Sequence, residues 1–88
     1  MLNKYVSREL RGFLKLLYIY NWRYIARDKN DELYIYQLCP IKGEDQWSSV
    51  DKIMASLESL YNFIDIDVVF KFIRWEDEEP FCIEDYIE

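Results

Sequence analysis

Two short segments rich in tyrosine and isoleucine constrain the fold more than any other feature of this chain. They span Arg23–Asp28 and Leu33–Leu38, with the sequence Lys-Asn-Asp-Glu between them. Asn30 and Asp31 tolerate the left-handed backbone conformation that a hairpin loop of this length requires, so the two segments predict a β-hairpin. The residues Tyr34–Tyr36 are apolar in succession, which indicates a sheet that is partly covered on both faces.

The residues before the hairpin predict an amphipathic helix from Asn3 to about Tyr18, with Asn3 as its N-cap. Its apolar stripe is formed by Val6, Leu10, Phe13, Leu14 and Leu17. Nearly opposite that stripe lies a basic face of four cations, Lys4, Arg8, Arg11 and Lys15. This face is either an ordinary solvated surface or a surface that binds nucleic acid or an acidic partner.

A second helix is predicted after the hairpin. Pro40 ends the second strand, and residues 41–47 are expected to form a loop that contains Gly43. Ser48 or Ser49 can then cap a helix whose apolar side chains cover about 120° of the helical wheel. Those side chains are Val50, Ile53, Met54, Leu57, Leu60, Tyr61 and Ile64.

A strand and a tail element end the predicted order. Apolar residues alternate with period two over residues 67–75, which indicates a strand. Pro80 can then start a short helical turn in the apolar and acidic segment 81–87. The expected fold is a small single-layer α+β domain over residues 1–88, with the order α-β-β-α-β and a short C-terminal helical or irregular segment.

The residue types present argue against an enzyme. The chain has no histidine, which removes the Ser-His and Cys-His nucleophile pairs and the zinc sites that use histidine. The acidic residues lack the spacing of a calcium-binding loop, so neither a metal nor another cofactor is expected. Ser48 and Ser49 are better explained as helix caps than as nucleophiles. The sequence therefore predicts a binding protein with no catalytic residues and no small-molecule substrate.

The cysteines and the apolar segments indicate a soluble cytoplasmic protein. Cys39 and Cys82 are 43 residues apart without a CxxC pair, and we expect them to be reduced and to line the core. The longest apolar run, Phe13–Tyr20, is interrupted by Lys15 and is much shorter than the ~20 residues of a membrane span. No signal peptide precedes it.

Charge is distributed unequally along the chain. Residues 1–42 contain eight basic and four acidic side chains, whereas residues 43–88 contain three basic and thirteen acidic ones. The acids culminate in a C-terminal run without an intervening cation, formed by Glu76, Asp77, Glu78, Glu79, Glu84, Asp85 and Glu88. This run is a divalent-cation site, a mimic of nucleic-acid phosphates, a docking surface for a basic protein, or a solubilising tail. The cation site is the weakest alternative.

Three stretches resemble one known group of proteins. They are Tyr24–Tyr34 with the sequence YIARDKNDELY, Pro40–Gly43 with the sequence PIKG followed by Trp47, and Trp75–Pro80 with the sequence WEDEEP. The pattern resembles small proteins encoded by phages and prophages of Gram-positive bacteria, although the glycine usual in the hairpin loop is absent. The resemblance implies a cytoplasmic viral protein made in an infected bacterium, where small acidic proteins act as inhibitors of host defence, including anti-CRISPR proteins.

Three functional hypotheses follow. The first is a stoichiometric inhibitor that presents the acidic run to a cationic groove of a host nucleic-acid-processing or defence protein, such as a CRISPR effector, with Trp75 as an apolar anchor. The second is an accessory protein that binds nucleic acid or an acidic partner through the basic face of Lys4, Arg8, Arg11 and Lys15. The third is a structural module that associates with itself.

Overall fold

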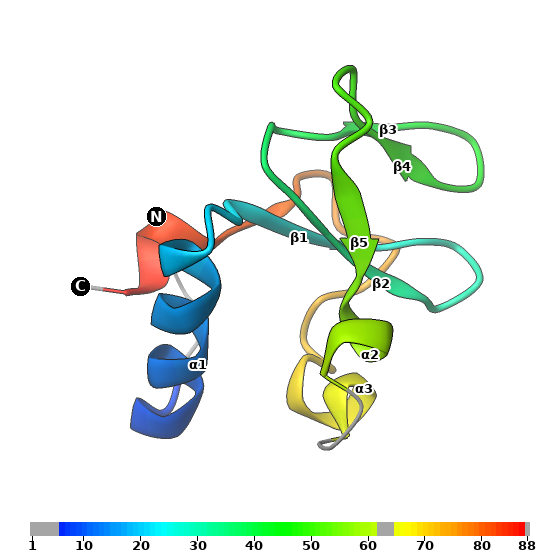
Figure 1. The fold of residues 1–88 in the computed structure, drawn as a ribbon. Coiled ribbons are helices and arrows are strands. Elements are labelled where there is room, and N and C mark those ends of the chain that lie inside the picture. Colours follow the sequence, from blue (N-terminus) through cyan, green and yellow to red (C-terminus); the bar gives the residue numbers. More distant parts are fainter. Residues whose placement is uncertain (1–5, 62–64, 88) are drawn as a thin grey trace.

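A computed structural model describes residues 6–61 and 65–87, which form a small α+β domain (Figure 1). The elements are α1 (Arg8–Ile19), β1 (Tyr24–Arg27), β2 (Leu33–Tyr36), β3 (Ile41–Lys42), β4 (Trp47–Ser48), β5 (Met54–Ser56), α2 (Leu57–Leu60), α3 (Ile66–Val69), β6 (Phe81–Cys82) and the 3-10 helix η1 (Ile83–Tyr86). The predicted fold class is confirmed. The predicted order is confirmed through the first hairpin and is wrong after it.

The predicted hairpin forms the centre of the main sheet. β1 and β2 pair antiparallel with Tyr24 opposite Tyr36. In the loop between them, Asp31 has a φ of 75°, and the side chain of Asn30 accepts a hydrogen bond from the N–H of Glu32 at 3.0 Å. These polar residues therefore make the turn without a glycine. The strands β5 and β6 extend the hairpin to a four-stranded sheet in the order β5-β2-β1-β6.

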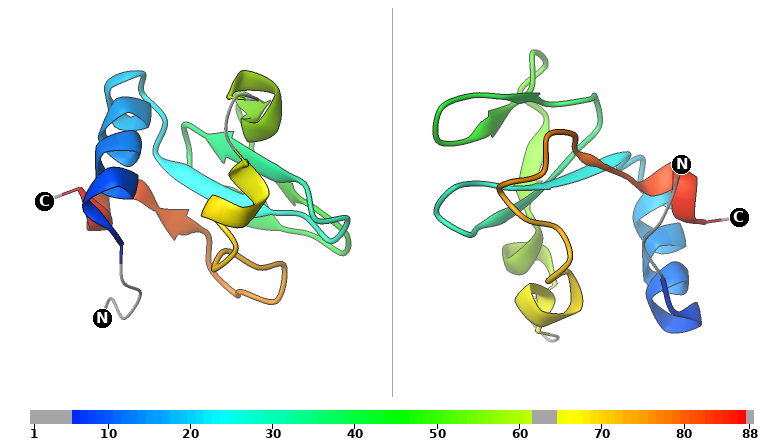
Figure 2. Two further views of the ribbon diagram at one scale, coloured as in Figure 1. Left: turned by 90° about the horizontal axis from the view of Figure 1, so that it is seen from below. Right: turned by 180° about the vertical axis from the view of Figure 1, so that it is seen from behind.

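The sheet is covered on both faces. Ile25 and Ile35 pack into a core that also contains buried residues of α1, α2 and α3, whereas Tyr36 packs with Trp47 on the opposite face. The helices therefore lie on one side of the sheet and the small β3–β4 hairpin on the other (Figure 2). The apolar run Tyr34–Tyr36 predicted this arrangement, but the result is a three-layered domain in place of a single layer.

The helix α1 begins at Arg8, five residues later than predicted. Its N-cap is Ser7, whose hydroxyl accepts a hydrogen bond from a main-chain N–H of the first turn at 3.1 Å. Asn3, the predicted N-cap, lies outside the described residues. Leu14 and Leu17 are fully buried, so the predicted apolar stripe does face the core.

The segment predicted as a loop, residues 41–47, contains part of a second hairpin. β3 and β4 pair antiparallel with Lys42 opposite Trp47. A Cβ atom at Gly43 would lie 2.9 Å from the carbonyl oxygen of Gln46, so the tight turn between the two strands requires glycine. Ser48, one of the two predicted helix caps, is a residue of β4.

The predicted second helix is wrong because a side-chain turn interrupts it. The Asp51 carboxylate accepts hydrogen bonds from the Ser49 hydroxyl and from the N–H of Ile53, and Lys52 between them has a φ of 58°. A helix cannot pass through a left-handed residue without breaking. Val50, which the helix would have buried, is 79% exposed.

The residues after this turn pair with the sheet. Met54 of β5 lies opposite Tyr36 of β2, and the helical part is reduced to the four residues of α2, with Ser56 as their cap. Leu57 is fully buried as predicted, although it begins α2 and does not lie in the middle of a longer helix. Ile64, the last apolar position of the predicted helix, lies outside the described residues.

The strand predicted over residues 67–75 is also wrong. The short helix α3 is formed there, with Asp65 as its side-chain cap, and turns follow it. Ile66, Phe70 and Ile73 are buried, and their spacing of four and three residues is helical. The alternation of apolar residues in this segment therefore did not indicate its secondary structure.

The C-terminal segment returns to the sheet before it turns. β6 follows Pro80 and pairs with β1, with Cys82 opposite Tyr24, and only then does the chain form η1. The predicted helical turn is therefore confirmed, but it begins at Ile83. Both cysteines are free thiols, and Cys82 is half-buried. Cys39 is exposed, so its predicted place in the core is wrong.

Candidate functional site

The acidic loop, residues 76–79, lies in the turn between α3 and β6. Glu76, Glu78 and Glu79 are exposed, whereas Asp77 is half-buried. The Asp77 carboxylate accepts a hydrogen bond from the N–H of Arg74 at 3.1 Å, and the N–H of Asp77 donates to the carbonyl oxygen of Arg74 at 3.1 Å. Asp77 therefore shapes the turn, and the other three carboxylates are available to a partner.

Lys42 of β3 holds the backbone of this loop in place. Its ammonium group donates hydrogen bonds to the carbonyl oxygens of Trp75 at 2.6 Å and Asp77 at 3.0 Å. The same ammonium lies 4.3 Å from the centre of the Trp75 ring, within the range of a cation–π interaction. The donors of Lys42 thus bind main-chain oxygens, and the acidic side chains project from a backbone that is fixed at two points.

Trp75 is less available than an anchor residue needs to be. Its side chain is half-buried and packs against the cluster of Ala26, Tyr36 and Trp47 on the β3–β4 side of the sheet. The predicted role of Trp75 as an apolar contact for a partner therefore applies only to the part of the ring that remains exposed. The buried part of the ring packs the start of the acidic loop against the second hairpin.

Glu84 and Asp85 form a second acidic group on η1. Both are exposed, and β6 separates them from the acidic loop. Their negative charges reach Tyr24: burial is the main cause that raises the pKa of this phenol, followed by Cys82, Cys39 and these two carboxylates. The predicted C-terminal run is thus divided into two groups at the two ends of β6. Glu88 lies outside the described residues.

The exposed acids of the C-terminal run form no ion pair within the described part of the chain. The ion pairs Arg27–Asp67 and Lys29–Asp45 lie elsewhere. Within the C-terminal run, the described carboxylates without an ion pair or a side-chain hydrogen bond are those of Glu76, Glu78, Glu79, Glu84 and Asp85. An exposed acidic surface of this kind attracts cationic groups over about one Debye length, ~8 Å at physiological ionic strength.

The basic face of α1 adjoins this acidic end. Arg8, Arg11 and Lys15 are exposed on the helix, and Lys4 lies outside the described residues. The side chain of Arg11 donates a hydrogen bond to the carbonyl oxygen of Tyr86 at 3.1 Å, which ties α1 to η1. The basic face and the acidic group on η1 are therefore neighbours in space, although they come from opposite ends of the sequence.

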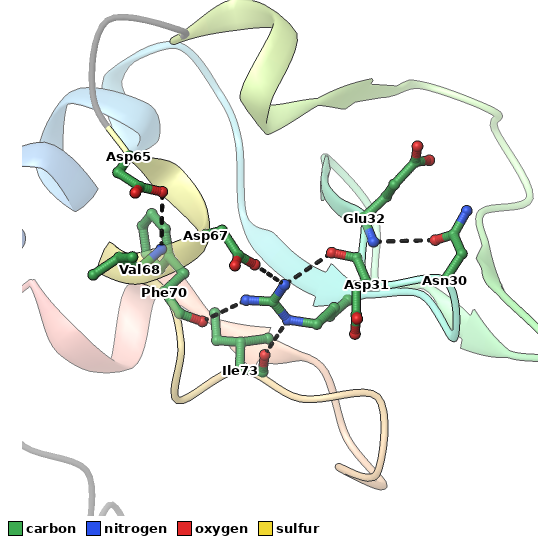
Figure 3. A network of polar contacts seen from close by, with 9 residues as sticks. Asn30, Asp31, Glu32, Asp65, Asp67, Val68, Phe70 and Ile73 are labelled. Atoms are coloured by element: carbon green, nitrogen blue, oxygen red, sulfur yellow. Dashed lines mark hydrogen bonds and ion pairs between the residues drawn. The ribbon is translucent and has the colours of Figure 1, made fainter.

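Arg27 is a buried cation that the sequence did not single out (Figure 3). Only 6% of it is exposed, and its guanidinium donates to the carbonyl oxygens of Ile73 at 2.6 Å, Asp31 at 2.8 Å and Phe70 at 3.0 Å. It also forms an ion pair with Asp67. Arg27 therefore joins the hairpin loop to α3 and to the turn that leads to the acidic loop.

Asp28, the next residue, has a similar structural role. Its carboxylate accepts a hydrogen bond from the N–H of Trp47 at 2.9 Å and so joins the first hairpin to the second. Burial raises the pKa of this carboxyl, the bond from Trp47 opposes the rise, and the nearby Glu32 charge adds to it. The charged form of Asp28 is thus less favourable in the folded protein than in the unfolded chain.

This raised pKa predicts that Asp28 contributes more to stability in acid. The contribution is fully present below the unfolded pKa of 3.8 and is lost as the pH rises through the higher folded value. The Asp28→Asn variant keeps a side-chain oxygen that can accept the hydrogen bond from the Trp47 N–H, but its amide group cannot ionise. The parent loses this contribution as the pH is raised from about 3 to about 7, and the variant does not. We therefore expect the free energy of unfolding of the variant, relative to that of the parent, to increase over this range.

Urea unfolding at several pH values measures this difference. Asp45→Asn is a matched control, because it makes the same substitution at an exposed carboxylate in the neighbouring loop. A variant–parent difference at Asp28 that shrank with rising pH would show that the carboxylate charge stabilises the fold.

Two kinds of feature are absent from residues 6–61 and 65–87. Over these ranges the structure contains no cluster of three or more side chains able to ligate a metal, and none of its helices has the length and apolar character needed to cross a bilayer. Comparison with protein-family models found no match, and the searches of curated proteins and of solved structures found no similar protein.

Proposed function

We propose that this protein is a non-enzymatic binding protein that inhibits a nucleic-acid-processing protein by occupying its cationic groove. The observation that supports the proposal is the set of exposed, unpaired carboxylates on a backbone that Lys42 fixes at Trp75 and Asp77. A fixed backbone reduces the conformational entropy that binding must overcome, so these acids are better placed than those of a free tail.

The charge of the whole chain favours a protein partner over nucleic acid. The formal net charge is −6, which opposes approach to a phosphate backbone. The same charge accelerates encounter with a basic groove. Glu84 and Asp85 lie beyond β6 from the acidic loop, so a partner that contacts both groups would have to follow the β6 edge of the sheet. An elongated cationic channel of the kind that binds nucleic acid has this shape.

The resemblance of three segments to phage-encoded proteins favours a target in an infected bacterium. A host defence nuclease, such as a CRISPR effector, combines the cationic groove with a reason for a phage to block it. On this proposal the protein acts stoichiometrically, needs no cofactor, and competes with nucleic acid for the groove.

Affinity capture with a matched pair of variants tests the proposal. The tagged protein is used to capture partners from a lysate of a Gram-positive host, and the binding of the captured protein is then measured after purification. We expect Glu78→Lys combined with Glu79→Lys to weaken this binding at least about tenfold, because two exposed charges change sign. Rising salt should weaken the parent's binding, and double-stranded DNA should displace it.

The control variant carries Glu9→Lys and Glu44→Lys, which change the net charge equally at exposed sites outside the acidic end. It should bind like the parent after correction for net charge. Equal loss in both double variants, capture of a protein that does not process nucleic acid, or direct binding of DNA to the parent in a gel shift would contradict the proposal. The last result would favour the basic face of Arg8, Arg11 and Lys15 as the functional surface.

A further inference from the structure

The second hairpin, residues 41–48, is a separate unit on one face of the main sheet. Its strands β3 and β4 pair with each other in a two-stranded sheet of their own. Figure 1 shows this hairpin at the top of the view, away from α2 and α3. Pro40 precedes it, and a turn in which Lys52 has a φ of 58° follows it. The second hairpin is therefore joined to the main sheet by irregular segments at both ends, which can act as hinges.

Contacts with the first hairpin dock the second hairpin on the sheet. The N–H of Trp47 donates to the Asp28 carboxylate at 2.9 Å, and the N–H of Lys29 donates to the carbonyl oxygen of Asp45 at 3.0 Å. The indole ring of Trp47 packs with Tyr36 on the buried cluster of this face. These contacts are not part of the β1–β2 ladder, so they can break together while the main sheet stays paired.

The docked second hairpin buries two polar atoms that lack a hydrogen bond. The Tyr36 hydroxyl and the indole N–H of Trp47 are inaccessible to solvent and have no hydrogen-bond partner among the described residues. Burial raises the pKa of the Tyr36 phenol, and the nearby charge of Asp28 adds to the rise. A buried polar group without a partner costs free energy that contact with water would recover. Both groups can reach water when the hairpin lifts from the sheet, so the docked state is less favourable than its apolar contacts alone imply.

The docked second hairpin also carries the acidic loop. Lys42 lies in β3, and its ammonium group donates to main-chain oxygens of Trp75 and Asp77. The same ammonium lies 4.3 Å from the centre of the Trp75 ring and 5.8 Å from that of the Trp47 ring. Trp75 in turn packs against the buried cluster beneath the hairpin. Movement of the second hairpin away from the sheet therefore breaks the contacts that fix the acidic loop.

We propose that the second hairpin is a hinged strap, which fixes the acidic loop when it is docked on the sheet and releases the loop when it lifts. The unpaired groups of Tyr36 and Trp47 set how readily the strap lifts. The effect of the strap on a partner rests on the proposed function, whereas the motion of the strap does not. A partner that binds the fixed loop would hold the strap down, since a ligand favours the state that it binds more tightly.

Native-state hydrogen exchange of the full chain tests the strap without a partner. The amides to follow are those of Trp47 and Lys29, whose hydrogen bonds dock the strap, and that of Asp77 in the acidic loop. We expect these three amides to share one opening equilibrium constant and to open more readily than the amides of the β1–β2 ladder. Tyr36→Phe removes the unpaired hydroxyl and keeps the ring, so it should slow the exchange of all three amides about tenfold.

Tyr34→Phe is the matched control, because the Tyr34 hydroxyl donates a hydrogen bond to the Glu32 carboxylate at 3.0 Å. This variant should leave the exchange of the three amides within about twofold of the parent. Unchanged or faster exchange of the Trp47 amide in Tyr36→Phe would overturn the proposal, because the hydroxyl would then not oppose docking. Slower exchange at Trp47 with no change at Asp77 would also overturn it, because the acidic loop would then move without the strap.

Lys42→Met tests the consequence of the strap for the captured partner. The variant makes the protein one charge more negative, so it would bind a cationic groove more tightly if net charge alone governed affinity. We expect it to bind about fivefold or more weakly, because the strap no longer fixes the acidic loop. Exchange of the β1–β2 amides shows in the same sample whether the variant is folded.

Lys15→Met is the control for charge, because it makes the same change at an exposed site on α1, and it should not weaken binding. Tighter binding of Lys42→Met would overturn the link between the strap and the acidic surface. Failure to capture any partner would contradict the proposed function alone, because the exchange of the Trp47 and Asp77 amides still decides whether the strap carries the loop.

Discussion

Replacement of Arg27 by methionine is expected to destabilise the fold by about 3–5 kcal/mol, because three carbonyl groups, two of them in buried hydrogen bonds, lose their donor at once. These carbonyls belong to Ile73, Phe70 and Asp31. The ion pair with Asp67 adds little, since the side chain of Asp67 is 58% exposed and screened by water. A domain of this size has a total stability of only about 4–13 kcal/mol, so the variant should be largely unfolded at moderate temperature.

Thermal and urea unfolding of Arg27→Met, followed by far-ultraviolet circular dichroism, measure this loss. Lys29→Met is the matched control: Lys29 is an exposed cation in the same hairpin loop, and its ion pair with Asp45 spans 3.5 Å on the surface. That variant should stay within about 0.5 kcal/mol of the parent. A similar small effect at Arg27 would mean that the turn after α3 is held by its apolar residues alone.

The first hairpin was predictable because its information is local. Asn30 and Asp31 supply the turn conformation, and tyrosine and isoleucine supply the strand preference within a few residues of it. The apolar stripe of α1 was predictable for the same reason, since Leu14 and Leu17 repeat at helical spacing. Only the start of α1 was misplaced, because Ser7 caps as well as asparagine does.

The second half was not predictable from periodicity alone. Residues 50–64 have the apolar spacing of a helix, but the bonds of Asp51 break the helix and β2 offers a strand partner for Met54. Pairing with a distant strand is a tertiary interaction and overrides local propensity. Six of the nine residues 67–75 are apolar, so helical and alternating patterns both fit them. The cap at Asp65 was the local signal for α3.

The candidate site was predicted in part. The exposed acids Glu78 and Glu79 could be identified from the sequence, since a run of like charges is solvated. The hydrogen bonds by which Lys42 fixes the backbone of the acidic loop could not be predicted, because Lys42 and Trp75 are 33 residues apart in the sequence. Arg27 left a signal that sequence analysis missed: it shares the core-facing side of β1 with Ile25, two residues away. A charged residue at an inward strand position is buried only when its donors are satisfied.

Leu57 and Leu60 lie one turn apart in α2 and differ mainly in burial. Their replacement by alanine is therefore expected to change the free energy of unfolding by very different amounts. Leu57 is fully buried, whereas Leu60 is 48% exposed. We expect Leu57→Ala to destabilise the domain by about 2–5 kcal/mol through lost apolar burial and the cavity that remains. Leu60→Ala should cost less than about 1 kcal/mol, since about half of Leu60 stays in water in the folded state.

Urea unfolding monitored by tryptophan fluorescence measures both changes in one assay, and the shared helix removes helix propensity as an explanation for a difference. Leu57 directly follows β5 and packs in the core that the helices form with the sheet. Equal destabilisation by the two variants would contradict the position of α2, in which Leu57 is fully buried and Leu60 is about half exposed at the end of the helix.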